Sequence, residues 1–354
     1  MTKTAILYSP KYLDHNPGVG HPESPNRLKV IMKELKASGF LEKEECSIIE
    51  PKPARIEDVE LVHNLNYIKL VEQFCRRGGG VLDLGDTVAS PESFDVALQA
   101  VGGALKAAEL VMEKRFQNAF AFVRPPGHHA GPNYACGFCI FNNIAVAATH
   151  LLLNFHLERI LILDVDAHHG NGTQEIFYDT NKVLYISLHQ DPHGFPGTGF
   201  TDEQGEKEGL GYTVNIPFPF QVDDQIYSDA LDQLAAPIIQ QYKPQFILVS
   251  VGFDGHYTDP VASLSLSANG YLETFEKILN SASKYCKGRL VAVLEGGYSL
   301  PFIGKLATGT IARMMGLSYP VQDKRPTADT RVQKQAEKLV KQARNFQSRF
   351  WNLK

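Results

Sequence analysis

The feature that most constrains this chain is the alternation of short apolar runs with longer segments of helical periodicity. Apolar runs of strand length occur at residues 6–8, 119–123, 159–163, 183–188, 246–251 and 290–294. Helical spacing of apolar residues covers 27–37, 57–75, 94–112, 142–153, 223–242 and 268–285. This alternation predicts an α/β fold with a mostly parallel central sheet and helices on both faces.

Length alone does not separate one domain from two, because a chain of 354 residues fits either. We see no internal repeat and no linker, and therefore predict one folded unit over residues 1–320 and a tail over residues 321–354. Within the tail, residues 329–354 carry an apolar stripe with Lys and Arg elsewhere. We expect a helix there that docks on the unit or mediates assembly, for example into a homo-oligomer.

Composition excludes several classes of protein. A net charge of −4 gives no general attraction to nucleic acid, and no apolar run is long enough to cross a bilayer. The first residues lack the apolar core of a signal peptide, so we expect a cytoplasmic protein without a membrane or nucleic-acid partner. The five cysteines are too few and scattered for a disulfide framework, and Cys136 and Cys139 have no second pair for a zinc finger.

A burst of polar residues follows the apolar run at 159–163. Asp164, Asp166 and His168 alternate with other residues, and in an extended chain they would point to one face. A glycine-rich stretch then ends the strand. The alternative is an acidic turn that happens to carry a histidine. Three side chains on one face that can each bind a metal ion or a proton favour a functional site instead.

Three other predicted strands also end in polar groups, and ligands of open α/β sheets bind beyond these carboxyl ends. Asp166, His168 and Asp254 would together supply the three protein ligands of a catalytic divalent ion. A lone Asp254 would otherwise be an ordinary turn carboxylate.

Two further groups at this edge have the chemistry of catalysis. His128 and His129 follow a rigid Pro-Pro-Gly loop and could carry protons. Tyr298 follows two glycines and could donate a hydrogen bond to a developing oxyanion, although alone it would be a half-buried aromatic. We expect His15 and His21, in an earlier loop, to be surface residues.

Seven short motifs carry a family resemblance. They are His21-Pro-Glu-Ser-Pro-Asn-Arg-Leu28, Arg124-Pro-Pro-Gly-His-His-Ala130, Gly137-Phe-Cys139, Asp164-Val-Asp-Ala-His-His-Gly-Asn-Gly172, Phe195-Pro-Gly-Thr-Gly199, Gly252-Phe-Asp254 and Leu294-Glu-Gly-Gly-Tyr298. In this order they resemble the histone deacetylase superfamily, in the branch of the second eukaryotic class and the bacterial and archaeal amidohydrolases. The resemblance runs from about residue 8 to residue 315 and implies the arginase/deacetylase fold.

The resemblance implies a role for each site residue. Zinc would be bound by Asp166, His168 and Asp254. His129 would be the general base, and then the acid that protonates the leaving amine. The remaining catalytic assignments are His128 as electrostatic companion, Asp164 as its partner, Asn171 as the partner of His129, and Tyr298 as the catalytic tyrosine.

The resemblance also implies a substrate tunnel, an exit channel and a second ion. Phe138 and Phe195 would form the tunnel walls, with Gly137 and Gly296 among the substrate-binding residues. Arg27 would line a channel for acetate. Potassium would bind near Asp164 and Ser187.

The substrate stays open between acetyl-lysine in proteins and small acetylated amines such as acetylpolyamines. Glu92 could favour a substrate with a second positive charge, or it could simply complement the dipole of the helix that follows. A non-catalytic acetyl-lysine binder would not need Tyr298 and two histidines.

A two-manganese hydrolase of the arginase kind would need further carboxylates. Gly170 and His256 stand in their places, which favours one metal. We expect His256 at the rim of the site.

Overall fold

The protein, described by a computed structural model over residues 2–353, is built around one eight-stranded sheet. Its order is β2-β1-β5-β10-β9-β6-β7-β8, and every neighbouring pair is parallel. The strands are β1 (Thr4–Leu7), β2 (Cys46–Ile49), β5 (Asn118–Ala121), β6 (Ile160–Asp164), β7 (Val183–Gln190), β8 (Thr213–Phe218), β9 (Phe246–Val251) and β10 (Leu290–Leu294). The α/β fold predicted from the alternating pattern is confirmed.

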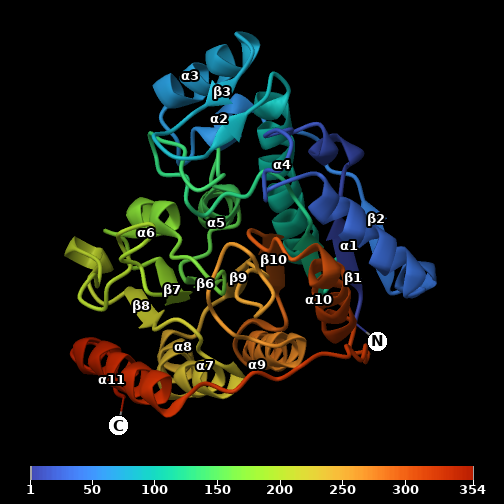
Figure 1. The fold of residues 1–354 in the computed structure, drawn as a ribbon. Helices are drawn as coiled ribbons and strands as arrows, with labels where there is room; N and C mark the ends of the chain where they lie inside the picture. Colours follow the sequence, from blue (N-terminus) through green and yellow to red (C-terminus); the bar gives the residue numbers. More distant parts are fainter. Residues whose placement is uncertain (1, 354) are drawn as a thin grey trace.

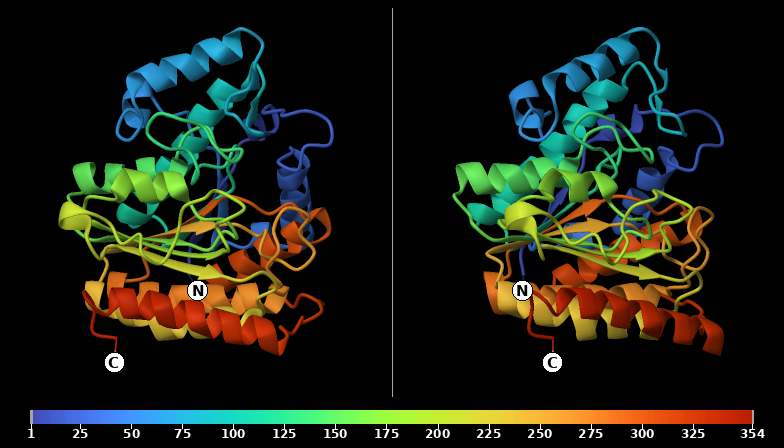
Figure 2. Two further views of the ribbon diagram at one scale, coloured as in Figure 1. Left: turned by 60° about the vertical axis from the view of Figure 1, so that its left-hand side comes forward. Right: turned by 90° about the vertical axis from the view of Figure 1, so that its left-hand side faces the viewer.

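Helices cover both faces of this sheet, as Figures 1 and 2 show. On one face lie α4 (Ser93–Met112) and α5 (Asn143–Asn154), and on the other lies α9 (Ala268–Cys286). Helix α10 (Leu300–Met314) packs against α9 and against α1 (Asn26–Ala37). The central strands are buried on both faces, which explains why they are apolar without alternation. No helix within residues 2–353 is both long and apolar enough to cross a membrane.

Two helical segments differ in detail from their predicted form. The segment predicted as one helix over 57–75 is two, α2 (Ile56–Val59) and α3 (Leu65–Arg76), because Asn64 caps the second with its side chain. The segment over 223–242 is continuous, from α7 (Asp224–Ala230) through a π-helical turn into α8 (Ala236–Tyr242). Pro237 explains this turn, since proline cannot donate the hydrogen bond that an α-helix requires.

The segment after residue 320 returns to the edge of the sheet. Helix α11 (Thr330–Gln347) packs on β8, where the side-chain amide of Gln347 donates to the Thr213 carbonyl at 2.8 Å. The Trp351 indole donates to the Gly211 carbonyl at 2.9 Å. α11 therefore covers β8, the last strand at this side of the sheet (Figure 1).

Candidate active site

Three metal-ligating side chains meet beyond the carboxyl ends of β6 and β9. Asp166 and His168 follow β6, Asp254 follows β9, and one ligand atom from each lies within 4.8 Å of the other two. His168 Nδ1 lies 2.9 Å from Asp254 Oδ2 and 3.3 Å from Asp166 Oδ1. The structure thus brings together the three residues expected to hold a metal ion.

The backbone aims these carboxylates. The N–H of Gly296 donates to Asp166 Oδ2 at 2.8 Å, and the N–H of Ala167 donates to Asp254 Oδ1 at 3.0 Å. Each carboxylate therefore keeps its other oxygen directed to His168. Such outer hydrogen bonds orient ligands in metal sites.

The charges of the cluster fit a cation. Both carboxylates are buried, and burial together with the charge of Asp166 raises the pKa of Asp254 to about 7. Burial opposes protonation of His168, but hydrogen bonds and charge from the two carboxylates raise its pKa to about 10. Two buried carboxylates and an imidazole are a donor set suited to zinc, which would replace the proton that this site attracts.

Gly296 leaves the space that an ion would need. A Cβ atom at this position would lie 2.5 Å from Asp254 Oδ2 and 2.7 Å from Asp166 Oδ2. A side chain there would push directly into the ligand cluster. The residues present therefore fit a metal ion, and only glycine fits beside it.

The two histidines after β5 face different partners. His128 Nδ1 lies 3.0 Å from Asp164 Oδ2, whereas His129 Nδ1 lies 2.8 Å from the amide oxygen of Asn171. Their ring centroids are 4.0 Å apart. Asn171 is the first residue of α6 (Asn171–Phe177), which begins directly after the metal-ligand loop.

The surroundings of the two imidazoles shift their pKa values in opposite directions. Burial disfavours a charge on His128, but Asp164 and Asp166 raise its pKa to about 10. For His129, burial and the neighbouring His128 charge lower the pKa well below the ordinary value. The site therefore holds a charged imidazolium beside a neutral imidazole, a division of roles that suits acid–base chemistry.

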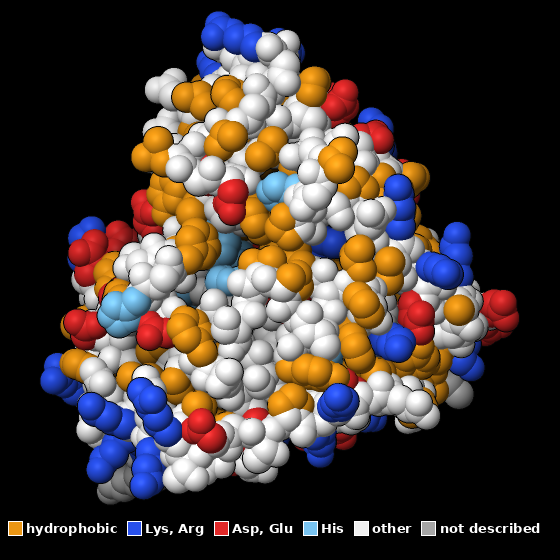
Figure 3. Space-filling view, in the orientation of Figure 1, with side chains coloured by type: hydrophobic (Ala, Val, Ile, Leu, Met, Phe, Trp, Pro, Cys, Tyr) orange, Lys and Arg blue, Asp and Glu red, His pale blue; other side chains and the backbone are white. Residues whose placement is uncertain are grey.

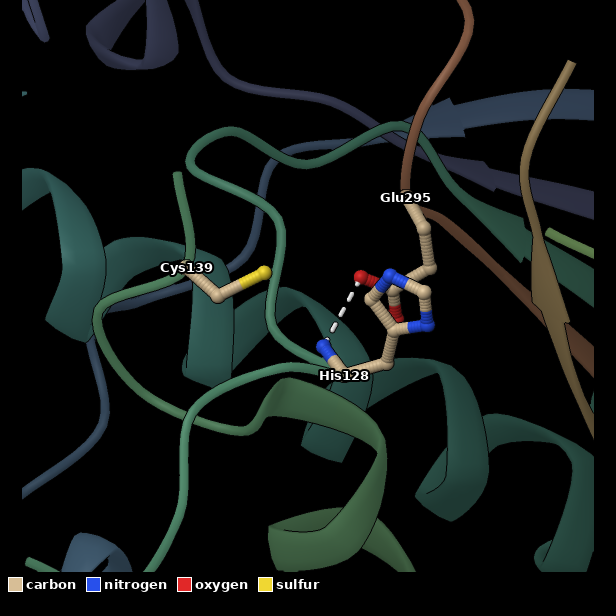
Figure 4. Close-up of side chains that lie close together, drawn as sticks. All are labelled: His128, Cys139 and Glu295. Carbon is tan, nitrogen blue, oxygen red and sulfur yellow. Dashed lines mark hydrogen bonds between the residues drawn. The ribbon is translucent and has the colours of Figure 1, made fainter. Parts of the chain in front are cut away.

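A second cluster of three side chains, shown in Figure 4, lies against this histidine loop. His128, Cys139 and Glu295 lie close enough to bind a metal, but Glu295 Oε2 already accepts the N–H groups of Gly127 at 2.7 Å and His128 at 3.1 Å. The ring of His128 already faces Asp164. We interpret Glu295 as a clamp on the loop, a role that the sequence analysis missed although Glu295 directly precedes Gly-Gly-Tyr.

The ring face of Tyr298 lies against Arg27. The Arg27 guanidinium lies 4.8 Å from the centroid of the Tyr298 ring, and Arg27 Nε donates to the Gly297 carbonyl at 2.6 Å. Arg27 Nη2 donates to the Glu295 carbonyl at 2.5 Å. Arg27 is fully buried and pairs with Glu23 at 3.1 Å, so it braces the loop that carries Tyr298.

Aromatic rings surround the approach to the metal-ligand cluster. The ring of Phe195 lies 4.9 Å from that of His129 and 5.9 Å from that of His168, and Phe138 lies 5.8 Å from Tyr298. In Figure 3 histidine side chains lie in a hollow near the centre of the face, with hydrophobic side chains around it.

The backbone at this wall is conformationally unusual. Gly137 has φ +53°, and a Cβ there would lie 2.5 Å from the His129 ring and 2.9 Å from the Phe195 ring. Phe138 also has a positive φ of 68°, and its N–H donates to Thr87 Oγ1 at 3.0 Å. Strain of this kind is typical of functional sites.

Glu92 and Ser187 lie outside this arrangement of side chains. Glu92 is exposed at the start of α4, where its carboxylate accepts a hydrogen bond from Ser90 Oγ at 3.0 Å. Ser187 pairs in register with Asp164 across β7 and β6, and its hydroxyl lies 2.7 Å from His189 Nδ1.

The structure changes the predicted location of three histidines. His15 is 1% exposed and lies 2.6 Å from Ser93 Oγ, so its prediction as a surface residue was wrong. His21 is half-buried, and its ring packs 4.7 Å from that of Phe138. His256 is fully buried rather than at the rim, because Asp323, far along the chain, pairs with it at 3.0 Å.

Comparison with known families identifies the family of the chain. Residues 21–314 match the model of the histone deacetylase domain. The chain therefore belongs to the histone deacetylase family. It is a deacetylase, a hydrolase that acts on amide bonds, and the family is typically zinc-dependent.

Individual relatives agree with this assignment. A probable deacetylase of Archaeoglobus fulgidus is 46% identical over 317 residues, covering 88% of this chain and 86% of that protein. The histone deacetylase-like amidohydrolase of Pseudomonas aeruginosa is 34% identical, covering 86% and 79%. The crystal structure of the HDA15 HD domain matches with a TM-score of 0.89 and 33% identity, covering 100% of this chain and 97% of that one.

Proposed function

We propose that this deacetylase uses one zinc ion to remove acetyl groups from acetyl-lysine in proteins or from small acetylated amines. The observation that carries the proposal is the convergence of Asp166, His168 and Asp254 within 4.8 Å of one another, beside two histidines whose rings face a carboxylate and an amide. These three residues would hold the ion. When bound, zinc supplies a Lewis acid for the acetyl carbonyl and makes water more acidic.

His129 is the proton carrier in this mechanism. Its Nδ1 faces the Asn171 amide oxygen at 2.8 Å and so carries the hydrogen, which leaves Nε2 free to accept one. His129 takes a proton from the attacking water at Nε2 and later gives it to the leaving amine. The depressed pKa of His129 keeps this nitrogen unprotonated before the reaction begins.

His128 and Tyr298 act on charge rather than as bases. His128 is held as an imidazolium by Asp164 and stabilises negative charge that develops beside it. Burial raises the pKa of Tyr298 well above its ordinary value, so its hydroxyl stays protonated and donates to the oxyanion.

The aromatic side chains would contact the aliphatic chain of the substrate, and the buried arginine would attract the acetate product. Phe138, Phe195 and Gly137 would enclose the aliphatic chain that carries the acetyl group and keep water out. Gly296 leaves room beside the ligands for that group. Arg27 would attract the acetate product into the interior, since its guanidinium lies 4.8 Å from the centroid of the Tyr298 ring.

Potassium is a further part of the proposal. Asp164 and Ser187 stand opposite each other on β6 and β7, fully buried, and offer carboxylate and hydroxyl oxygens. Oxygen donors suit a hard cation of this kind.

The proposal includes two substrate classes, proteins that carry acetyl-lysine and small acetylated amines. A protein substrate would present acetyl-lysine, whereas an acetylated polyamine would carry a second positive charge that Glu92, exposed at the start of α4, could attract. If Glu92 has that role, Glu92→Ala lowers kcat/KM for the acetylpolyamine more than for an acetyl-lysine peptide. If the ratio of kcat/KM for the acetylpolyamine to that for the peptide is unchanged, Glu92 does not select between the two substrates.

The proposal is tested by acetate release. The zinc-loaded protein is given an acetyl-lysine peptide and, separately, an acetylpolyamine, with Tyr298→Phe as the control variant. Release that falls about 100-fold in the variant supports the mechanism and ranks the two substrates. Release from neither substrate, or equal release by the variant, contradicts it and favours a different acyl amine or a binding role.

A further inference from the structure

The backbone that carries Tyr298 is held from behind by Asp259. The carboxylate Oδ2 of Asp259 accepts the N–H of Tyr298 at 2.6 Å and the N–H of Ser299 at 3.0 Å. Its other oxygen accepts the N–H of Val261 at 3.0 Å. One oxygen shared by two successive amides restricts the orientation of this turn, and with it the direction of the tyrosine side chain.

A second connection reaches the same turn through Thr258. Thr258 Oγ1 lies 2.6 Å from Ser299 Oγ and 2.9 Å from His256 Nδ1. The His256 ring stacks on Phe302, with centroids 4.4 Å apart and planes 29° apart. Because Phe302 lies in the first turn of α10, His256 supports both the turn and the helix that follows it.

Asp323 lies beyond the unit predicted over residues 1–320. It is the last member of the series of contacts that runs through His256 and Thr258 to Ser299. Its Oδ2 lies 3.0 Å from His256 Nε2 and accepts the Ala268 N–H at 2.7 Å. Its Oδ1 accepts the Tyr257 hydroxyl at 2.8 Å. The side chains of Asp323 and His256 have no exposed surface, and a buried carboxylate with this many donors is held firmly in place.

We propose that Asp323 is a positioning residue for Tyr298, acting through His256, Thr258 and Ser299. The part of the chain around Asp323 then belongs to the catalytic scaffold, although it lies beyond residue 320. This inference rests on the proposed role of Tyr298 as a hydrogen-bond donor. It gives a function to His256, whose two ring nitrogens face Thr258 and Asp323.

A carboxylate that only anchored the segment would affect all variants of the enzyme alike. A positioning residue instead affects the rate only while the group that it positions is present, because coupled residues are not additive. The two roles are therefore separated by placing the same substitution in enzymes with and without the Tyr298 hydroxyl.

The experiment measures kcat and KM of the full-length zinc-loaded enzyme with Asp323→Asn. Asn is isosteric but replaces one acceptor oxygen with a donor that opposes the Ala268 N–H. We expect kcat to fall about tenfold with KM unchanged, as a small displacement of a catalytic group produces. In the Tyr298→Phe background the same substitution should change kcat less than about twofold.

Asp329→Asn is the matched control. Asp329 is also a carboxylate of this segment and caps α11 by accepting the N–H groups of Arg331 and Val332, but it has no contact with the Tyr298 turn. Its substitution should leave kcat unchanged in both backgrounds. Zinc content and melting temperature are measured for every variant.

Thr258→Val provides a second route if Asp323→Asn does not fold. It breaks the connection at Ser299 but leaves the Asp323–His256 pair intact, and we expect the same dependence on Tyr298. An unchanged kcat, or a loss of equal size in both backgrounds, overturns the inference. If Tyr298→Phe alone retains full activity, the proposed function of Tyr298 fails, and the inference fails with it.

Discussion

At the scale of single residues, adjacent histidines acquire different chemistry from one neighbour each. Asp164 faces His128 and Asn171 faces His129, at 3.0 Å and 2.8 Å respectively. A carboxylate stabilises the imidazolium much more than an amide does. The identity of residue 171 is therefore one determinant of the basicity of the proposed proton carrier, beside burial and the charge of His128.

We predict that Asn171→Asp raises the pKa of His129. Burial and the charge of His128 now depress that pKa, and a carboxylate 2.8 Å from the ring would counteract both. His129 must be unprotonated to act as a base, so the acidic limb of the kcat/KM profile should move to higher pH. A movement of about one unit is expected.

Asn181→Asp makes the same change of charge at an exposed position and should leave the acidic limb where it is. If the limb also stays in place for Asn171→Asp, a group other than His129 controls that limb.

Gly296 provides a test of the metal site itself. We predict that Gly296→Ala abolishes zinc binding, because the new Cβ would lie 2.5 Å from Asp254 Oδ2 and 2.7 Å from Asp166 Oδ2. Zinc content after dialysis is the measurement. Gly194→Ala adds the same atom in open space and should bind zinc normally. Full zinc occupancy in Gly296→Ala would place the ion elsewhere.

The position of a residue could be predicted from the sequence where it depends on a local motif. It could not be predicted where it depends on a distant partner. Asp166, His168 and Asp254 each follow an apolar strand, and their meeting follows from the parallel sheet. The burial of His256 depends on Asp323, a contact across 67 positions that no local pattern encodes.

At the scale of elements, the edge strand β8 depends on α11. Ala336 and Ala343 of α11 are buried on the sheet, and the adjoining Trp351 packs its ring 5.5 Å from that of Tyr212. An uncovered edge strand would expose unpaired backbone groups and invite aggregation. α11 thus covers the outermost strand of the sheet.

We predict that Ala343→Glu releases α11 from β8. Ala343 is 1% exposed, and an unpaired carboxylate there would cost roughly 3 kcal/mol of stability. Since Trp351 is the only tryptophan, its fluorescence reports directly on docking and should shift to longer wavelength. Gln342→Glu, on the exposed side of the same helix, should change neither fluorescence nor melting temperature. An unshifted emission for Ala343→Glu would mean that α11 stays docked.

Edge strands were also the elements that the sequence analysis missed. The central strands are continuous apolar runs, whereas β2 is partly exposed and β8 contains Pro217. Proline argues against a strand unless it lies at an edge, and nothing local indicates that α11 would bury β8. Long helices such as α4 and α9 were predicted within a few residues, since their periodic faces pack on the sheet.

At the scale of the whole molecule, the metal-free protein should lose stability as the pH rises. Folding raises the pKa of His128 and His168 from 6.5 to about 10, so their contribution is complete below about pH 6.5 and disappears towards pH 10. The pKa of Asp254 rises from 3.8 to about 7, so keeping it ionised costs stability as the pH increases through that window. Both effects have the same sign.

Zinc should remove much of this dependence, because it replaces protons between the same ligands. We predict that the gain in melting temperature on adding zinc is larger near pH 8.5 than near pH 6. At about one hundred times its Kd, zinc adds about 2.7 kcal/mol. Calorimetry of metal-free and zinc-loaded protein at both pH values makes the comparison, and an equal gain at both would contradict it.

The position of β10 has a consequence for how the protein is made. β10 is the last strand to be synthesised, yet it pairs with β5 on one side and with β9 on the other. The strands β2-β1-β5 and β9-β6-β7-β8 are joined only through β10, so the sheet cannot be completed before residue 294 has been synthesised. Gly296 and Tyr298 follow immediately, so the final strand closes the sheet and delivers the last parts of the site in one step.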